Sequence, residues 1–250
     1  MSRFWPGVAR VFELSFGELL WSRRTLFVVM MVGAPVLLAV AARLSAVNAS
    51  VSINGASLDG RDMFEAIAWV LVLRFAVPIL GVWYGTSLIA DEVDDKTITY
   101  LFVRPVRRSA ILTGKYLAYL ACTGLVVLPS VAVVYFALVP MQPLSGVAGL
   151  LNNTAVLALG LAAYGALFAL MGAALRKPLV FGLVFAFGWE PLALLVPGYL
   201  RRFTLAYHLE AAFRDLPAAG GSLACLLAIT AICLVLAGRV VERREYLLEQ

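Results

Sequence analysis

Six long apolar stretches alternate with shorter polar connections along this chain. They cover, in order, residues 25–47, 65–90, 110–139, 147–175, 179–198 and 222–239. Each supplies about the 20 residues that a helix needs to cross a hydrocarbon core some 30 Å thick. Helices are the expected spanning form, because backbone groups find no water in lipid to hydrogen-bond. The pattern predicts an all-α polytopic membrane protein with six transmembrane helices.

Two further segments are amphipathic rather than uniformly apolar. In residues 4–24 the apolar positions recur at helical spacing, and the charged positions keep mostly to other faces. This favours a helix lying in the membrane interface before the first span, with a cytoplasmic extension of that span as the alternative. In residues 199–221 aromatic and charged side chains alternate before the last span. We expect a short interfacial or re-entrant helix there.

Composition agrees with a lipid-embedded chain. Hydrophobic residues make up 62% of the sequence and charged residues only 14%, against about a quarter in soluble domains. No basic, aromatic-interleaved patch indicates a nucleic-acid partner, so the net charge of +5 is better explained by membrane orientation. Cys122, Cys225 and Cys233 all fall inside apolar runs without metal-ligand spacing, so we expect buried thiols and no metal.

The positions of Lys and Arg predict the orientation. Fourteen of them fall before the first span, at or after the end of the last, or in or close to the connections that follow the second and fourth spans. The opposite connections hold only four, which are Arg61, Arg201, Arg202 and Arg214. Cytoplasmic connections carry the excess of basic residues, so both termini are expected in the cytoplasm.

Signatures of catalysis are missing from the sequence. There is no phosphate-binding G-x-x-x-x-G-K-[ST] loop, no G-x-S-x-G nucleophile elbow and no H-E-x-x-H zinc motif. We therefore predict that this chain is not an enzyme and binds no cofactor or metal of its own. An intramembrane enzyme would need a convergent polar cluster within the spans.

Two ionisable residues nevertheless fall inside predicted spans. Arg74 lies in the second and Glu190 in the fifth, each about 12–14 Å below the outer boundary at 1.5 Å per residue. An unpaired charge at such a depth costs at least about 2.5 kcal/mol. We hypothesise that Arg74 and Glu190 pair or jointly line a polar cavity. The alternative is two separate charges that reach water or lipid headgroups.

The segment 91–108, between the second and third spans, holds eight charged residues out of eighteen. Its order of elements is an acidic residue at the end of a span, a Lys-Thr pair, an apolar run, a Pro-x-x-Arg element and a Gly-Lys-Tyr start of the next span. The residues that form this pattern are Glu92, Lys96-Thr97-Ile98, Leu101, Arg104-Pro105-Val106-Arg107-Arg108 and Gly114-Lys115-Tyr116. In these features, and in its six spans, the chain resembles the permease subunits of ABC-2 type transporters.

The resemblance implies that residues 91–108 form a cytoplasmic coupling helix that docks on a soluble ATP-binding subunit. Physically, residues 92–103 can make a short helix that Pro105 ends. The alternative is a solvated loop whose charges only fix topology. The docking residues implied by the resemblance are Glu92, Asp94, Asp95, Ile98, Leu101, Phe102, Arg104, Arg107 and Arg108.

The same resemblance implies a complex in a bacterial cytoplasmic membrane. Two copies of this chain, each a single membrane domain over residues 1–250, would form the membrane core. Two ATP-binding subunits would carry ATP and Mg²⁺ and drive export. The alternative within the family is a complex that acts mechanically on an extracytoplasmic partner, in metal-centre maturation or surface-organelle assembly, without carrying cargo.

Overall fold

In a computed structural model the chain folds into a bundle of long helices, which confirms the predicted all-α class. The structure describes residues 4–21, 23–48, 52–53, 56–57, 60–88, 108–139, 145–196, 198–216 and 218–243. In the first connection between spans, strands β1 (Ser52–Ile53) and β2 (Ala56–Ser57) pair as a two-residue antiparallel ladder.

Six helices in the described part of the chain are long and apolar enough to cross a membrane, as predicted. Four spans are single helices: α2 (Arg23–Asn48), α7 (Arg108–Leu138), α8 (Ser145–Ala174) and α12 (Gly220–Arg243). The second span is the continuous run of α3 (Gly60–Ala66), η1 (Ile67–Ala76), α4 (Val77–Leu80) and η2 (Gly81–Gly85). The fifth span is the run of α9 (Pro178–Leu183), η3 (Val184–Trp189) and α10 (Glu190–Leu195). The segments η1, η2 and η3 are π-helical.

The observed ends of the spans lie close to the predicted ones, and the largest difference is at the second span. That helix begins at Gly60, five residues before the predicted start. Its first turns contain Arg61 and Glu65, which form an i,i+4 ion pair at 3.5 Å. Charged residues at this spacing stabilise a helix, although a search for apolar residues leaves them out.

The fourth span, α8, lies at the centre of the bundle. Of its most apolar window 61% is buried inside the chain, against 22% for the first span and 28% for both the fifth and the sixth. Those outer spans present large apolar side chains on their surfaces, such as Met30, Leu37 and Ile232. Exposed apolar residues on helices of this length fit a lipid environment.

Glycines let the second span approach α8 closely along a contact that we call the glycine seam. It consists of Gly81, Gly85 and Gly172 with their neighbours Tyr164, Phe168 and Thr86. A Cβ atom added at Gly81 would lie 2.9 Å from the Cβ of Tyr164, and one at Gly85 would lie 2.8 Å from the Cβ of Phe168. One at Gly172 would lie 2.5 Å from the backbone oxygen of Thr86. Small residues at such contacts let helix backbones approach in lipid.

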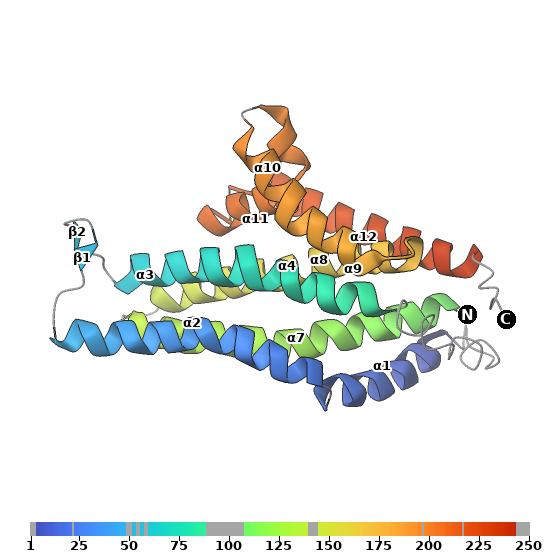
Figure 1. Cartoon of the computed structure of the whole chain (residues 1–250), viewed down its shortest axis with the longest axis horizontal. Coiled ribbons are helices and arrows are strands. Elements are labelled where there is room, and N and C mark those ends of the chain that lie inside the picture. The colour runs from blue at the N-terminus through green and yellow to red at the C-terminus, as the bar shows by residue number, and fades with distance from the viewer. Residues whose placement is uncertain are drawn as a thin grey trace.

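The N-terminal amphipathic segment is a helix of its own, α1 (Phe4–Leu20), which ends before α2 begins. It packs chiefly on the first part of α7 (Figure 1). Gly114 of α7 makes this contact possible, because a Cβ there would lie 2.9 Å from the Cβ of Val11 and 2.9 Å from the carbonyl oxygen of Val8. α1 and α2 are therefore separate helices, and the position of α1 in the membrane interface stays a prediction.

The fifth span leaves the bundle at an angle, and we call residues 178–203 the raised hairpin (Figure 1). It consists of α9, η3 and α10, followed by the 3₁₀ helix η4 (Tyr199–Phe203). Its outer side chains are largely exposed, for example Leu195 at 80% and Phe203 at 79%. The chain then returns to the bundle through α11 (Leu205–Arg214), which precedes α12. The predicted short amphipathic helix is thus present as α11.

The long helices alternate in direction, so their ends form two groups. At one end of the bundle Gly60 lies against the carbonyl group of Leu138. At the other end Thr86 meets Gly172, and Ser109 meets Gly238. The start of α1 and the end of α12 both lie at this second end (Figure 1). The start of α7 and the described end of the second span are there too.

Candidate functional site: a charged cavity within the spans

The predicted docking segment lies almost entirely outside the described residues. This holds for Glu92, Asp94, Asp95, Ile98, Leu101, Phe102, Arg104 and Arg107. Arg108 is described only as the first residue of α7. The coupling helix and its docking role therefore stay predictions.

The described residues at both ends of that segment belong to a firmly packed part of the bundle. Before it, Thr86 contacts Gly172 of α8. After it, Leu112 of α7 forms a small buried cluster with Ala173, Ala237 and Val241, which come from α8 and α12. A force applied to the segment between these ends would thus act on the second, third, fourth and sixth spans together.

A cavity of about 340 Å³ lies where the raised hairpin meets the rest of the bundle. Its walls come from η1, α8, η3, α10 and the start of α11. Most of the lining side chains are apolar: Val70, Leu71, Phe75, Ala186, Phe187, Pro191, Leu194 and Ala206. The polar ones are Arg74, Tyr164 and Glu190. Both of the charged residues singled out from the sequence therefore line this cavity.

Glu190 is 3% exposed, and its carboxylate is held on both oxygens. The hydroxyl of Tyr164, from α8, donates a short hydrogen bond to Oε2. The backbone N–H of Leu205 donates to Oε1 at 3.0 Å. The backbone N–H of Ala206 also faces this carboxylate. Charge-assisted bonds of this kind offset the cost of burying a carboxylate.

These contacts make Glu190 part of the cap of α11. Leu205 and Ala206 are the first two residues of that helix, and their N–H groups have no acceptor within it. The side chain of Thr204 accepts from the third, the N–H of Tyr207, at 3.3 Å. A carboxylate is also favoured at a helix N-terminus by the helix dipole. Glu190 therefore joins the raised hairpin, α8 and α11 at one point.

His208 makes a second connection between α11 and its neighbours. One ring nitrogen, Nε2, lies 2.9 Å from the carbonyl oxygen of Arg202 in η4. The other, Nδ1, lies 3.3 Å from the hydroxyl of Ser222 in α12. These contacts account for the single histidine as a structural residue of the returning chain.

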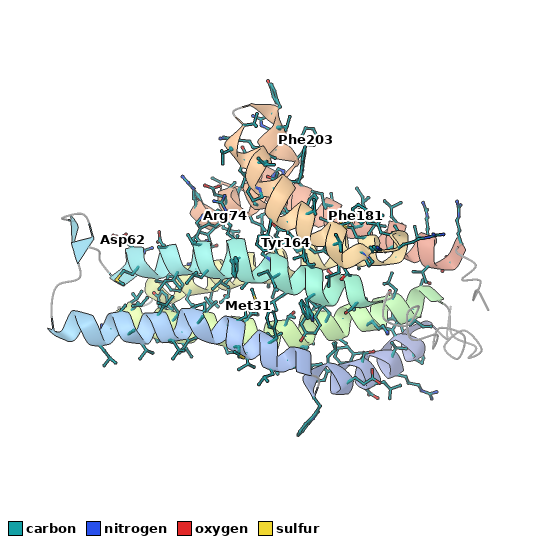
Figure 2. All side chains as sticks on the ribbon, in the orientation of Figure 1. Met31, Asp62, Arg74, Tyr164, Phe181 and Phe203 are labelled. Atoms are coloured by element: carbon teal, nitrogen blue, oxygen red, sulfur yellow. The ribbon has the colours of Figure 1, made fainter. Side chains whose placement is uncertain are left out.

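Arg74 lies at the midpoint of the second span, fourteen residues from Gly60 and fourteen from Leu88. Its side chain is exposed, and Figure 2 shows it beside the base of the raised hairpin, near Tyr164. It is close enough to act electrostatically on Glu190 and Tyr164. Ion pairs within 4 Å are recorded among the described residues for Arg61–Glu65 and Arg214–Glu210, and not for Arg74–Glu190. The functional pairing of the two charges stays a prediction.

Both intramembrane charges adjoin π-helical backbone. Arg74 is inside η1, and Glu190 directly follows η3. A π-helical turn has i→i+5 hydrogen bonds and is wider than an α-helical one, and such turns are frequent at functional sites. Here they set the two side chains on the walls of one cavity.

Sequence reasoning identified Arg74 and Glu190 but missed the groups that hold the carboxylate. Tyr164 gave no signal, because a tyrosine in an apolar helix resembles any other aromatic core residue. Thr204 did give one, since a threonine directly before a helical run is a typical N-cap. The backbone amides of α11 could be expected once that cap was recognised.

Comparison with known families places this geometry in context. The model of a family described as "ABC-2 family transporter protein" matches residues 11–206. The match begins in α1, includes five of the six spans and ends at the start of α11. It therefore contains every residue that lines the cavity. A search of curated proteins found no match.

Proposed function

The chain belongs to the ABC-2 family of transporter proteins, which are membrane components of ABC transporters, and on this premise we propose that it exports a substrate using ATP hydrolysed by a separate subunit. Members of this family work with an ABC-type ATP-binding partner and are not themselves catalytic. The role of membrane permease follows from membership of this family. Export, two ATP-binding subunits and a second copy of this chain are the parts that we propose.

The observation that supports transport best is the position of the cavity. One side is formed by the second span and α8, which the glycine seam holds together. The other side is formed by η3 and α10 of the raised hairpin. A rigid-body displacement of one side against the other would change the shape of the cavity. This geometry suits a site that alternates in access, and it favours cargo handling over the purely mechanical alternative.

We propose that the driving force enters through residues 91–108. The described ends of this segment lie at the end of the bundle where α8 ends and α12 ends. The adjoining stretches of α1, α7 and α12 contain Arg10, Lys115 and Arg239, and the connection from α8 to α9 contains Arg176 and Lys177. This excess of basic residues supports a cytoplasmic position for that end. ATP-binding subunits docked there would act on the packed second, third, fourth and sixth spans.

Association of the permease with its ATP-binding partner tests this proposal directly. We expect charge reversal of Arg107 and Arg108 (R107E/R108E) to lower the ATPase activity that co-purifies with the chain from native membranes by about tenfold, because complementary charge sets the register of docking surfaces. The matched control is R201E/R202E, which also reverses two adjacent arginines but lies in η4 of the raised hairpin.

In the control, co-purified ATPase activity should stay within twofold of the unmodified chain. Labelling of single cysteines at both ends of the bundle should show that both variants insert in the same orientation. Equal ATPase recovery with R107E/R108E would reject docking through this segment. An absence of ATPase activity from preparations of the unmodified chain would reject the proposed function as a whole.

A further inference from the structure

Among the described residues that line the cavity, Arg74 is the one cation, and most of the others are apolar. The Glu190 carboxylate is engaged by Tyr164 and by the N-terminus of α11. Arg74 lies on the wall of the same cavity with its side chain exposed. A guanidinium is always charged and presents five N–H donors in a fork that fits phosphate and carboxylate groups. The cavity therefore has the chemistry to bind an acid group beside an apolar chain.

The depth of Arg74 restricts where that acid group comes from. The helix continues for fourteen residues on each side of Arg74 and is longer than the hydrocarbon core is thick, so Arg74 lies near the centre of the core. A charge at the centre of a span costs about 2.5–3.5 kcal/mol, so a counter-ion there is favoured. Headgroups of resting lipids lie at the two surfaces of a core about 30 Å thick. An acid group reaches this depth only when it is carried into the membrane.

We propose that this cavity binds an anionic amphiphile that enters from the bilayer, with its phosphate or carboxylate on Arg74 and its chain against Phe75, Phe187 and Leu194. The volume of about 340 Å³ is at the lower end of the range for small-ligand sites. It therefore fits an acid group and the adjoining part of a chain, while the remainder extends into lipid. This assignment deepens the proposed function by naming a class of cargo, and it rests on that function.

Both sides of the cavity contribute to the binding we propose. Arg74 and Phe75 belong to the second span, whereas Phe187 and Leu194 belong to the raised hairpin. A bound amphiphile would thus contact the part of the permease fixed to α8 and the part that leaves the bundle. Displacement of one part against the other would change the contacts of the acid group with Arg74.

The test measures binding of radiolabelled phosphatidic acid to the full-length chain, purified in a neutral maltoside detergent. We expect Arg74→Gln to weaken binding by about tenfold or more, because it removes a charge-assisted contact to the acid group. The matched control is Arg43→Gln, which removes an exposed arginine of the first span that does not line the cavity. It should change the affinity by less than twofold.

Two further variants keep the result interpretable if Arg74→Gln fails to fold. Arg74→Lys retains the charge without the bidentate fork and should lie between the unmodified chain and Arg74→Gln. Leu194→Trp places a larger side chain at the cavity wall and should weaken binding severalfold with the charge intact. Zwitterionic phosphatidylcholine should bind at least tenfold more weakly than phosphatidic acid to the unmodified chain.

The remaining outcomes would overturn the inference. If Arg74→Gln binds phosphatidic acid as tightly as the unmodified chain does, the lipid binds elsewhere. Equal competition by inorganic phosphate would identify a site for free anions rather than for amphiphiles. A loss of self-association with Arg74→Gln, without any change in lipid binding, would show that Arg74 faces a second copy of the chain. Because the binding assay contains no ATPase, its result is independent of the co-purification test of the proposed function.

Discussion

The glycine seam and the raised hairpin are two parts of the same bundle that are held by different forces. Along the glycine seam, backbones approach so closely that Gly81, Gly85 and Gly172 leave no room for a methyl group. The raised hairpin is only 28% buried over its span. Gly182 of α9 packs against Val82 and Phe168, and Glu190 adds a buried polar connection to α8 and α11. Packing alone fixes the first contact, whereas the second combines a smaller packed area with a polar network.

This difference indicates where the permease can change shape. A packed contact resists partial displacement, since a helix that slides along it meets backbone atoms of its neighbour. A network of a few hydrogen bonds contributes about 0.5–1.5 kcal/mol for each bond, or about 1.5–3 kcal/mol where a charge takes part. We therefore expect the second span and α8 to move as one body and the raised hairpin to move against them. The cavity lies at the boundary between the two.

The largest effect should come from adding one methyl group to the glycine seam. In Gly172→Ala the new Cβ would lie 2.5 Å from the backbone oxygen of Thr86, so two helices have to separate. Overpacking of this kind costs about 1–3 kcal/mol or more. We expect a melting temperature in detergent lowered by several degrees and a smaller yield of monodisperse protein. Gly33→Ala in α2, where nothing lies within 4 Å of the new Cβ, should melt like the unmodified chain.

Next in size should be the loss of the Glu190 carboxylate. Glu190→Leu leaves the Tyr164 hydroxyl and the Leu205 N–H buried without their acceptor, at about 1–3 kcal/mol for each group. Tryptic cleavage at Arg201 or Arg202 should then accelerate about tenfold, because cleavage follows the population of the opened hairpin. Glu190→Gln keeps a carbonyl oxygen as acceptor and should show a smaller increase. Global unfolding at the same rate as cleavage would contradict a local role for this residue.

The seam and the hairpin also differ in how far the sequence predicted them. The apolar periodicity located all six spans, because a membrane imposes both a length and a polarity on each helix. Small residues in the second and fourth spans are typical of close helix packing, but they do not identify the partner helix. That partner depends on the tertiary arrangement, which puts Gly81 against Tyr164 and Gly172 against Thr86.

For the cavity, the cost of charge in lipid singled out Arg74 and Glu190, and both line it. It did not predict that backbone amides of α11 would take the carboxylate, since these amides become available only when the chain turns at Thr204 and returns to the bundle. The sequence did not predict the angle of the fifth span either, because an apolar run of eighteen residues can form an upright or an inclined helix.

A smaller effect is expected from Tyr164→Phe, which tests one bond of the network. The ring stays in place against Phe168, with which it stacks at a centroid distance of 6.0 Å. Only the hydroxyl that donates to Glu190 is lost, while the Leu205 N–H keeps its acceptor. We expect cleavage at Arg201 or Arg202 to rise by severalfold, less than in Glu190→Leu. An unchanged cleavage rate would show that the contact of Glu190 with α11, and not its contact with Tyr164, keeps the raised hairpin in place.

The smallest effect should come from Glu210→Ala, which removes the surface pair on α11. Glu210 accepts from Arg214 at 2.6 Å, but the Arg214 side chain is 76% exposed and solvated. Exposed i,i+4 pairs contribute about 0.3–0.5 kcal/mol, so tryptic cleavage at Arg201 or Arg202 should change by less than about twofold. The substitution keeps every tryptic site, which makes it a fair comparison with Glu190→Leu. A tenfold acceleration here would mean that α11 is held by its own helical stability, and Glu190 would lose its place as the point that joins the raised hairpin to the bundle.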